Sequence, residues 1–267
     1  MSAVIVLRQM LRDRTRSTIW WSVAMIALVV AVGASYPTIK ASAGGLEDLM
    51  ESMPEGLGEL LGAAGGITSP VGYLNSQFYS NMFPILLLVF GIGIASWSVA
   101  GAEREGTLEP LLANPVRRSR VALGRYAGLV LLLAVVVVVT TLVLIAFRGP
   151  FQLSEISVAN LVAAGVASFL LALLFATITY AVGAATGRKG LAAALGGGLA
   201  AATYVVFGLG SFVSALESVR WLSPWYWFLE PSPLVDGWTL ASIALPLLVI
   251  VPAVALGTVW FTRRDLR

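Results

Sequence analysis

Six long apolar runs dominate the sequence and leave few folds open to it. Each run is long enough for an α-helix to cross the roughly 30 Å hydrocarbon core of a bilayer. The runs are continuous rather than alternating, which favours helices over the strands of a barrel. Charged residues make up 12% of the chain, against about 25% in soluble proteins. We therefore expect an all-α integral membrane protein with six transmembrane helices, at about residues 18–36, 80–100, 121–147, 158–185, 191–213 and 238–261.

The first run follows a basic segment, 2–17, in which apolar and arginine side chains fall on different faces of a helix. This pattern predicts an amphipathic helix lying in the membrane interface. The alternative is a plain basic flank, and the two interpretations are compatible with each other. The run at 18–36 is longer than the 7–15 apolar residues typical of a signal peptide. We therefore expect it to remain as a membrane anchor.

The lysines and arginines give the orientation. All of them except Lys40, Arg148 and Arg220 fall in segments that six spans would place on the side of the two termini. The positive-inside rule puts that side, including the loop 101–120, in the cytoplasm. Segments 37–77 and 214–237 then become extracellular excursions. The first has leucines and glutamates at helical spacing, which favours a lid over the span ends rather than a cation site.

Several kinds of chemistry are missing from the sequence. There is no cysteine and no histidine, which excludes disulfides and the common Cys/His metal sites. No acidic or basic residue stands deep in a span, and this argues against a proton-coupled carrier or an intramembrane hydrolase. The glycines near Lys189 lack the spacing of a phosphate-binding loop. We expect no enzymatic activity and no cofactor on this chain.

The loop Gly101–Arg120 is the most distinctive stretch between spans. It begins with charged residues, continues with Gly106-Thr107 and a leucine group at helical spacing, and stops at Asn114-Pro115. This pattern predicts a short amphipathic helix, tethered to spans at both ends, that a partner can push. By itself the pattern favours an ordinary connecting loop with an interface helix, in which the arginines only fix the orientation.

The order of residues in this loop, E-R-E-G-T-L-E-x-L-L-x-x-P-V-x-R, resembles the cytoplasmic loop between the second and third spans of ABC-2 type transporter permeases. Pro110 departs from the family pattern. The segment Leu222–Tyr226, with Pro233, Leu234 and Gly237, resembles the aromatic segment before the last span of that family. The resemblance implies that the loop docks on an ATP-binding subunit. The residues it assigns to this coupling are Glu103, Glu105, Gly106, Thr107, Leu108, Glu109, Leu111 and Leu112.

The resemblance implies that residues 1–267 form one transmembrane domain, the permease subunit of an ABC exporter in the inner or plasma membrane. Two ATP-binding subunits would carry ATP and Mg²⁺, and a second copy or a homologous permease would complete the pair. Membrane lipid surrounds the assembly, and no nucleic acid is expected. The alternative is a membrane scaffold or sensor subunit that transports nothing and serves a signalling or immunity complex with an ATPase.

In this family the second and fifth spans face each other across a central cavity. On the second span, large apolar side chains recur on one helical face, and Thr203, Phe207 and Ser211 share a face of the fifth. Such a lining suits a hydrophobic or amphiphilic substrate, whether drug-like, lipid-like or a peptide. The alternative is that these side chains pack against neighbouring helices or lipid. The candidate path residues are Phe83, Phe90, Ile94, Trp97, Thr203, Phe207 and Ser211.

Overall fold

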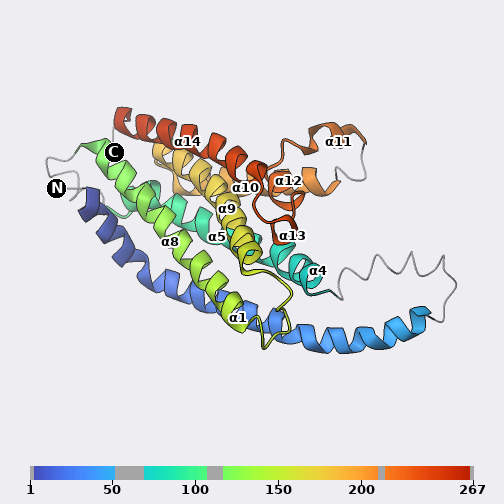
Figure 1. The fold of residues 1–267 in the computed structure, drawn as a ribbon. Coiled ribbons are helices and arrows are strands. Elements are labelled where there is room, and N and C mark those ends of the chain that lie inside the picture. Colours follow the sequence, from blue (N-terminus) through green and yellow to red (C-terminus); the bar gives the residue numbers. More distant parts are fainter. Residues whose placement is uncertain (1–2, 52–68, 107–116, 210–213, 265–267) are drawn as a thin grey trace.

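The computed structural model describes residues 3–51, 69–106, 117–209 and 214–264. Within these ranges it contains no strand, and its long helices run side by side in an elongated bundle (Figure 1). Six helical stretches are long and apolar enough to cross a membrane. The expected all-α membrane architecture is therefore confirmed. The six stretches are Val4–Ser42, Pro70–Arg104, Arg118–Phe147, Val158–Thr186, Lys189–Leu209 and Leu240–Arg263.

The first helix differs from its prediction. Helix α1 (Ala3–Glu51) is continuous, so the structure shows no separate interface helix that ends at residue 17. The same helix continues past Pro37, where the excursion 37–77 was expected to begin. The hydroxyls of Thr15 and Thr18 donate to carbonyls one turn back and so do not cap a new helix. Residues 3–32 of the helix contain no glycine or proline, so no helix-breaking residue stands near residue 17. Figure 1 shows its C-terminal part extending beyond the bundle.

The second stretch is one long helical rod in which two segments have π-helical pairing. It begins at Ser69, whose hydroxyl accepts a bond from the amide of Gly72 at 3.1 Å. The rod is longer than the predicted span 80–100 because it includes polar residues at both ends. In order, its segments are α4 (Pro70–Leu74), η1 (Asn75–Met82), α5 (Phe83–Ser96), η2 (Trp97–Gly101) and α6 (Ala102–Arg104).

The third, fourth and sixth spans begin and end close to where the sequence predicts, and the fifth begins close to its predicted start. The predicted end of the fifth, residue 213, lies outside the described residues. Ser157 caps the amino end of the fourth, and Gly187, with φ +66°, ends it in the left-handed conformation. Within 214–237, Pro224 and Pro233 occupy the first turns of short helices, where no amide is needed. The remaining helices are α8 (Arg118–Phe147), α9 (Val158–Thr186), α10 (Lys189–Leu209), α11 (Ser214–Arg220), α12 (Pro224–Leu229), α13 (Pro233–Asp236) and α14 (Leu240–Arg263).

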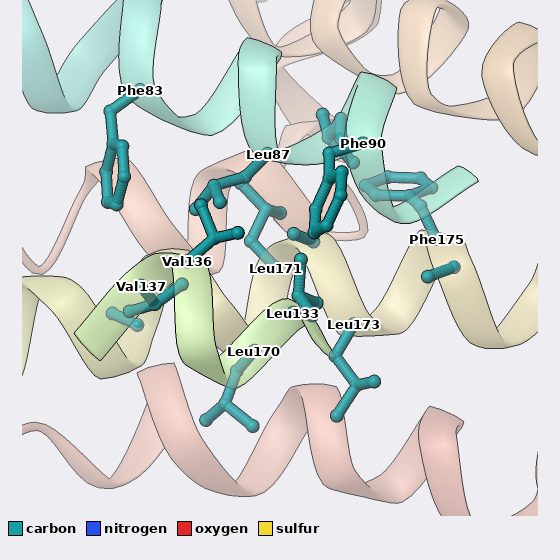
Figure 2. Close-up of a cluster of buried hydrophobic side chains, with 14 of the residues drawn as sticks. Phe83, Leu87, Phe90, Leu133, Val136, Val137, Leu170, Leu171, Leu173 and Phe175 are labelled. Atoms are coloured by element: carbon teal, nitrogen blue, oxygen red, sulfur yellow. The ribbon is translucent and has the colours of Figure 1, made fainter. Parts of the chain in front are cut away.

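Helix α9 forms the centre of the bundle, and α5, α8, α10 and α14 all pack on it. Its side chains are mostly buried, whereas α10 and α14 expose apolar side chains along much of their length. Figure 2 shows the core where α5, α8 and α9 meet. It includes Phe83, Leu87, Phe90, Leu133, Val136, Val137, Leu170, Leu171, Leu173 and Phe175.

Candidate functional site

The second span ends at the start of the charged loop, at the end of the bundle that holds residues 3 and 264, called here the terminal end (Figure 1). The amide of Gly106 donates to the carbonyl of Glu103 at 3.0 Å, and Gly106 has φ +69°. This left-handed residue ends helix α6 and turns the chain into the loop. Of the predicted coupling residues, Glu103, Glu105 and Gly106 are described. The others lie outside the described residues: Thr107, Leu108, Glu109, Leu111 and Leu112.

Three elements meet in one set of contacts at the terminal end. The Arg264 guanidinium at the end of α14 forms an ion pair with Glu103 of α6, and both side chains are largely buried. Arg118, at the start of α8, donates to the backbone carbonyl of Arg264 at 2.8 Å. A cavity of about 680 Å³ adjoins the ion pair. It is lined by Glu103, Arg104, Thr186, Gly187, Arg188, Leu191 and Arg264.

Trp97 lies in a second set of contacts, called here the Trp97 cluster and formed with Arg14, Glu105 and Arg125. The indole N–H donates to Oε2 of Glu105 at 2.9 Å. The guanidinium carbons of Arg14 and Arg125 lie 3.7 and 5.3 Å from the centroid of the indole ring. Trp97 is thus held among charged groups, where cation–π contacts fix its ring.

Arg125 is the residue that the sequence reasoning missed. Counted there only among the cytoplasmic charges, it lies within α8 and is 1% exposed. Its NH1 donates to the backbone carbonyl of Ser98 at 3.1 Å. The available signal was that Arg125 already stands inside an apolar run, between Gly124 and Tyr126.

The predicted path residues of the second span do share one helical face, and this face points into the subunit's own core. Phe83, Phe90 and Ile94 are almost wholly buried. Figure 2 shows Phe83 and Phe90 in the core. The ring of Phe90 lies 5.4 Å from that of Trp21 on α1. Packing against neighbouring helices, the alternative considered from the sequence, accounts for these contacts.

A cavity of about 450 Å³ lies along the opposite face of α5, between α5 and α10. Its lining is almost entirely apolar. Tyr204 donates to Oδ1 of Asn81 at 3.1 Å, and the indole of Trp225 donates to the carbonyl of Ala200, also at 3.1 Å. We call this cavity the α5–α10 groove. Its lining residues are Ile85, Leu88, Val89, Ile92, Gly93, Gly197, Ala200, Ala201, Tyr204 and Trp225.

A second cavity of about 500 Å³ continues from the groove away from the terminal end, and the two share Tyr204. Phe207, one of the predicted path residues, lines it. The Arg220 guanidinium lies 4.6 Å from the centroid of the Phe207 ring and pairs with Glu230. Thr203 lines neither cavity, and its carbonyl accepts a bond from Ser223. Ser211 lies outside the described residues.

A model of the ABC-2 family transporter proteins matches residues 4–266, nearly the whole chain. The chain belongs to the ABC-2 permease family. No curated protein sequence matches it. The permease is therefore a multi-pass membrane protein and a component of an ABC transporter, not itself catalytic. Permeases of this family usually work with an ATP-binding subunit.

Proposed function

We propose that the permease is the membrane subunit of an ABC exporter in the inner or plasma membrane, with the terminal end in the cytoplasm. It moves a hydrophobic or amphiphilic substrate out of the cytoplasm. Two copies of a separate ATP-binding subunit hydrolyse ATP, with Mg²⁺, and a second permease copy or a homologue completes the pair. The α5–α10 groove is the observation that carries this proposal.

The groove has the chemistry that such a substrate requires. Its walls are aliphatic side chains and glycines from the second and fifth spans, together with the rings of Tyr204 and Trp225. An ion or a sugar phosphate entering it would lose hydration without gaining partners, which costs several kcal/mol. An apolar molecule loses nothing comparable, and the Tyr204 hydroxyl fixes its orientation. The proposed path therefore runs along the exposed face of α5. Phe207, one of the path residues predicted from the sequence, lies in the cavity that continues this path away from the terminal end.

The terminal end supports the coupling part of the proposal. Glu103 and Arg264 join the last turn of the second span to the end of the sixth. The same span lines the groove through Val89 and Gly93. A displacement of the loop 101–120 by an ATP-binding subunit therefore acts directly on a helix that forms the groove wall. The arginines at this end suit contact with cytoplasmic lipid phosphates as well.

The test fills the groove. Val89, 55% exposed, is replaced by Trp, and Val138, 54% exposed on α8 and away from the groove, is replaced by Trp as the matched control. The permease and its ATP-binding subunit are reconstituted in proteoliposomes, and transport and ATP hydrolysis are measured over a panel of amphiphiles. V89W is expected to change the ranking of the amphiphiles, and V138W is expected to leave it unchanged.

Two outcomes would count against the proposal. An identical ranking for V89W and wild type would remove the groove from the substrate path. ATP hydrolysis that no amphiphile stimulates, together with no transport, would favour the alternative of a scaffold or sensor subunit.

A further inference from the structure

The second span changes its hydrogen-bond pairing just before the charged loop. Residues Trp97–Gly101 form the π-helical segment η2, between α5 and α6. A π turn pairs each amide with the carbonyl five residues back, so it contains one residue more than an α turn over the same path. Such a turn persists only where surrounding contacts favour it over the more stable α pairing.

Arg125 supplies such a contact from a neighbouring helix. Its NH1 donates to the carbonyl of Ser98, inside the π turn, at 3.1 Å. The guanidinium also lies against the ring of Trp97, the first residue of the same turn. Both Ser98 and Trp97 are buried, so the bond and the ring contact form away from solvent.

Trp97 passes this constraint to the loop. A Cβ at Gly101 would lie 2.8 Å from Cδ1 of Trp97, so the indole lies along the helix over a residue that must be small. From there its N–H donates to Glu105, the residue before the left-handed Gly106. The contacts therefore run without a gap from α8, through the π turn, to the first residues of the loop.

The burial of Arg125 is costly, and packing alone does not require it. Its Nε and NH2 atoms have no hydrogen-bond partner within the described part of the chain. The carboxylates of Asp13 and Glu105 attract the Arg125 guanidinium, and the guanidinium of Arg14 repels it. An apolar side chain of similar volume often stabilises a buried position as well as an ion pair does or better. The guanidinium therefore points to a role that methionine or leucine would not fill.

We propose that Arg125 is a positioning residue that holds the π turn Trp97–Gly101 and thereby sets the direction in which the charged loop leaves the second span. This proposal rests on the coupling role proposed above for the loop. Without Arg125, the turn returns to α pairing. Every residue beyond it then rotates by about 100° and moves about 1.5 Å along the axis. The Glu103 carboxylate turns away from Arg264, and the loop no longer presents the same face to its partner.

The direct test measures the position of α6. The natural chain contains no cysteine, so spin labels are attached at R104C, just beyond the π turn, and at R8C on α1. Both side chains are exposed. In nanodiscs, R125M is expected to shift the distance distribution by roughly 5–8 Å, the displacement of a side chain after a one-residue change of register. R120M, an exposed arginine on the same helix, is expected to leave it unchanged.

Two milder variants keep the proposal testable if R125M does not fold. R125K keeps a donor for the Ser98 carbonyl but loses the planar contact with the indole, so its shift should be partial. W97F keeps an aromatic ring but loses the indole N–H and with it the bond to Glu105, so it should broaden the distribution. Unchanged distances in folded R125M, or in both R125K and W97F where R125M does not fold, would overturn the proposal.

A second measurement separates this inference from the proposed function. In the complex with the ATP-binding subunit, R125M is expected to lower the amount of substrate transported per ATP while hydrolysis continues. A shifted distance with an unchanged transport ratio would uphold Arg125 as the residue that positions the loop and would overturn the coupling role of the loop. A lowered ratio without any shift would overturn the positioning role.

Discussion

Three successive glycines, Gly196, Gly197 and Gly198, offer a sharp test of how α10 packs on α9. A Cβ added at Gly196 would lie 1.8 Å from Oγ1 of Thr179 on α9, whereas one added at Gly198 would meet nothing within 4 Å. Gly197 lines the groove, so a substitution there would also change the groove. The same substitution by alanine should therefore change the free energy of unfolding in opposite directions at Gly196 and Gly198.

The magnitude follows from the contact. The Thr179 hydroxyl donates to the carbonyl of Phe175 at 2.8 Å, so it leaves its position only by losing that bond or by moving the helices apart. Overpacking of this kind costs about 1–3 kcal/mol. Alanine in place of glycine within a helix stabilises the folded state by about 0.5–1 kcal/mol. G196A should thus destabilise the permease by on the order of 1–2 kcal/mol, while G198A should stabilise it by up to about 1 kcal/mol.

The assay is equilibrium unfolding in mixed micelles with a rising fraction of SDS, applied to G196A, G198A, T179A and the double variant G196A/T179A. Removing the threonine hydroxyl removes the contact at 1.8 Å, although the Thr179 Cβ at 3.1 Å remains. The double variant should therefore recover part of the loss, with a coupling energy of about 1 kcal/mol. Equal effects of G196A and G198A, or additive effects in the double variant, would refute the packing of α10 on α9 through this face.

Two further predictions concern orientation and coupling. A cysteine at Ser232 should react with an impermeant thiol reagent on intact cells and a cysteine at Thr262 should not, because the arginine count places Thr262 in the cytoplasm; the reverse pattern would overturn that orientation. G106A should lower transport per ATP, because a residue with φ +69° tolerates a Cβ at a cost of about 1 kcal/mol. G149A, an exposed turn glycine without positive φ, is its control, and equal coupling in the two variants would contradict the role of the Gly106 turn.

The existence of six spans, and most of the ends of the later ones, were readable from the sequence because bilayer insertion depends on local quantities. Continuous apolar length decides whether a helix crosses, and Ser157 and Gly187 carry the usual signals of a helix start and stop. The continuity of α1 was not readable in this way. The change from basic to apolar composition near residue 17 marks a change of environment, but a helix ends only where its backbone pairing is interrupted.

The candidate site was harder to predict because periodicity identifies a helical face but not what that face contacts. Phe83, Phe90 and Ile94 do fall on one face, and it packs on α8 and α9. The groove face of the same helix contains Val89 and Gly93, which give no striking pattern in the sequence. Only the placement of neighbouring helices distinguishes the two faces, and that placement depends on contacts between residues far apart in the chain.

The two π-helical segments lie on one span, and each contributes residues to a different candidate site. Helix α5 lies between them, and η1 contributes Ser80 and Asn81 to the second cavity, of about 500 Å³, while η2 contributes Trp97 to the Trp97 cluster. Segments of this kind are often found at functional sites, since their backbone pairing is less firmly fixed than that of an α-helix. On the proposed function, a push on the loop reaches α5 through a turn held by side chains of α1 and α8. The groove wall then moves as a rigid helix between two adjustable turns, which is the motion that opening and closing a cavity between α5 and α10 requires.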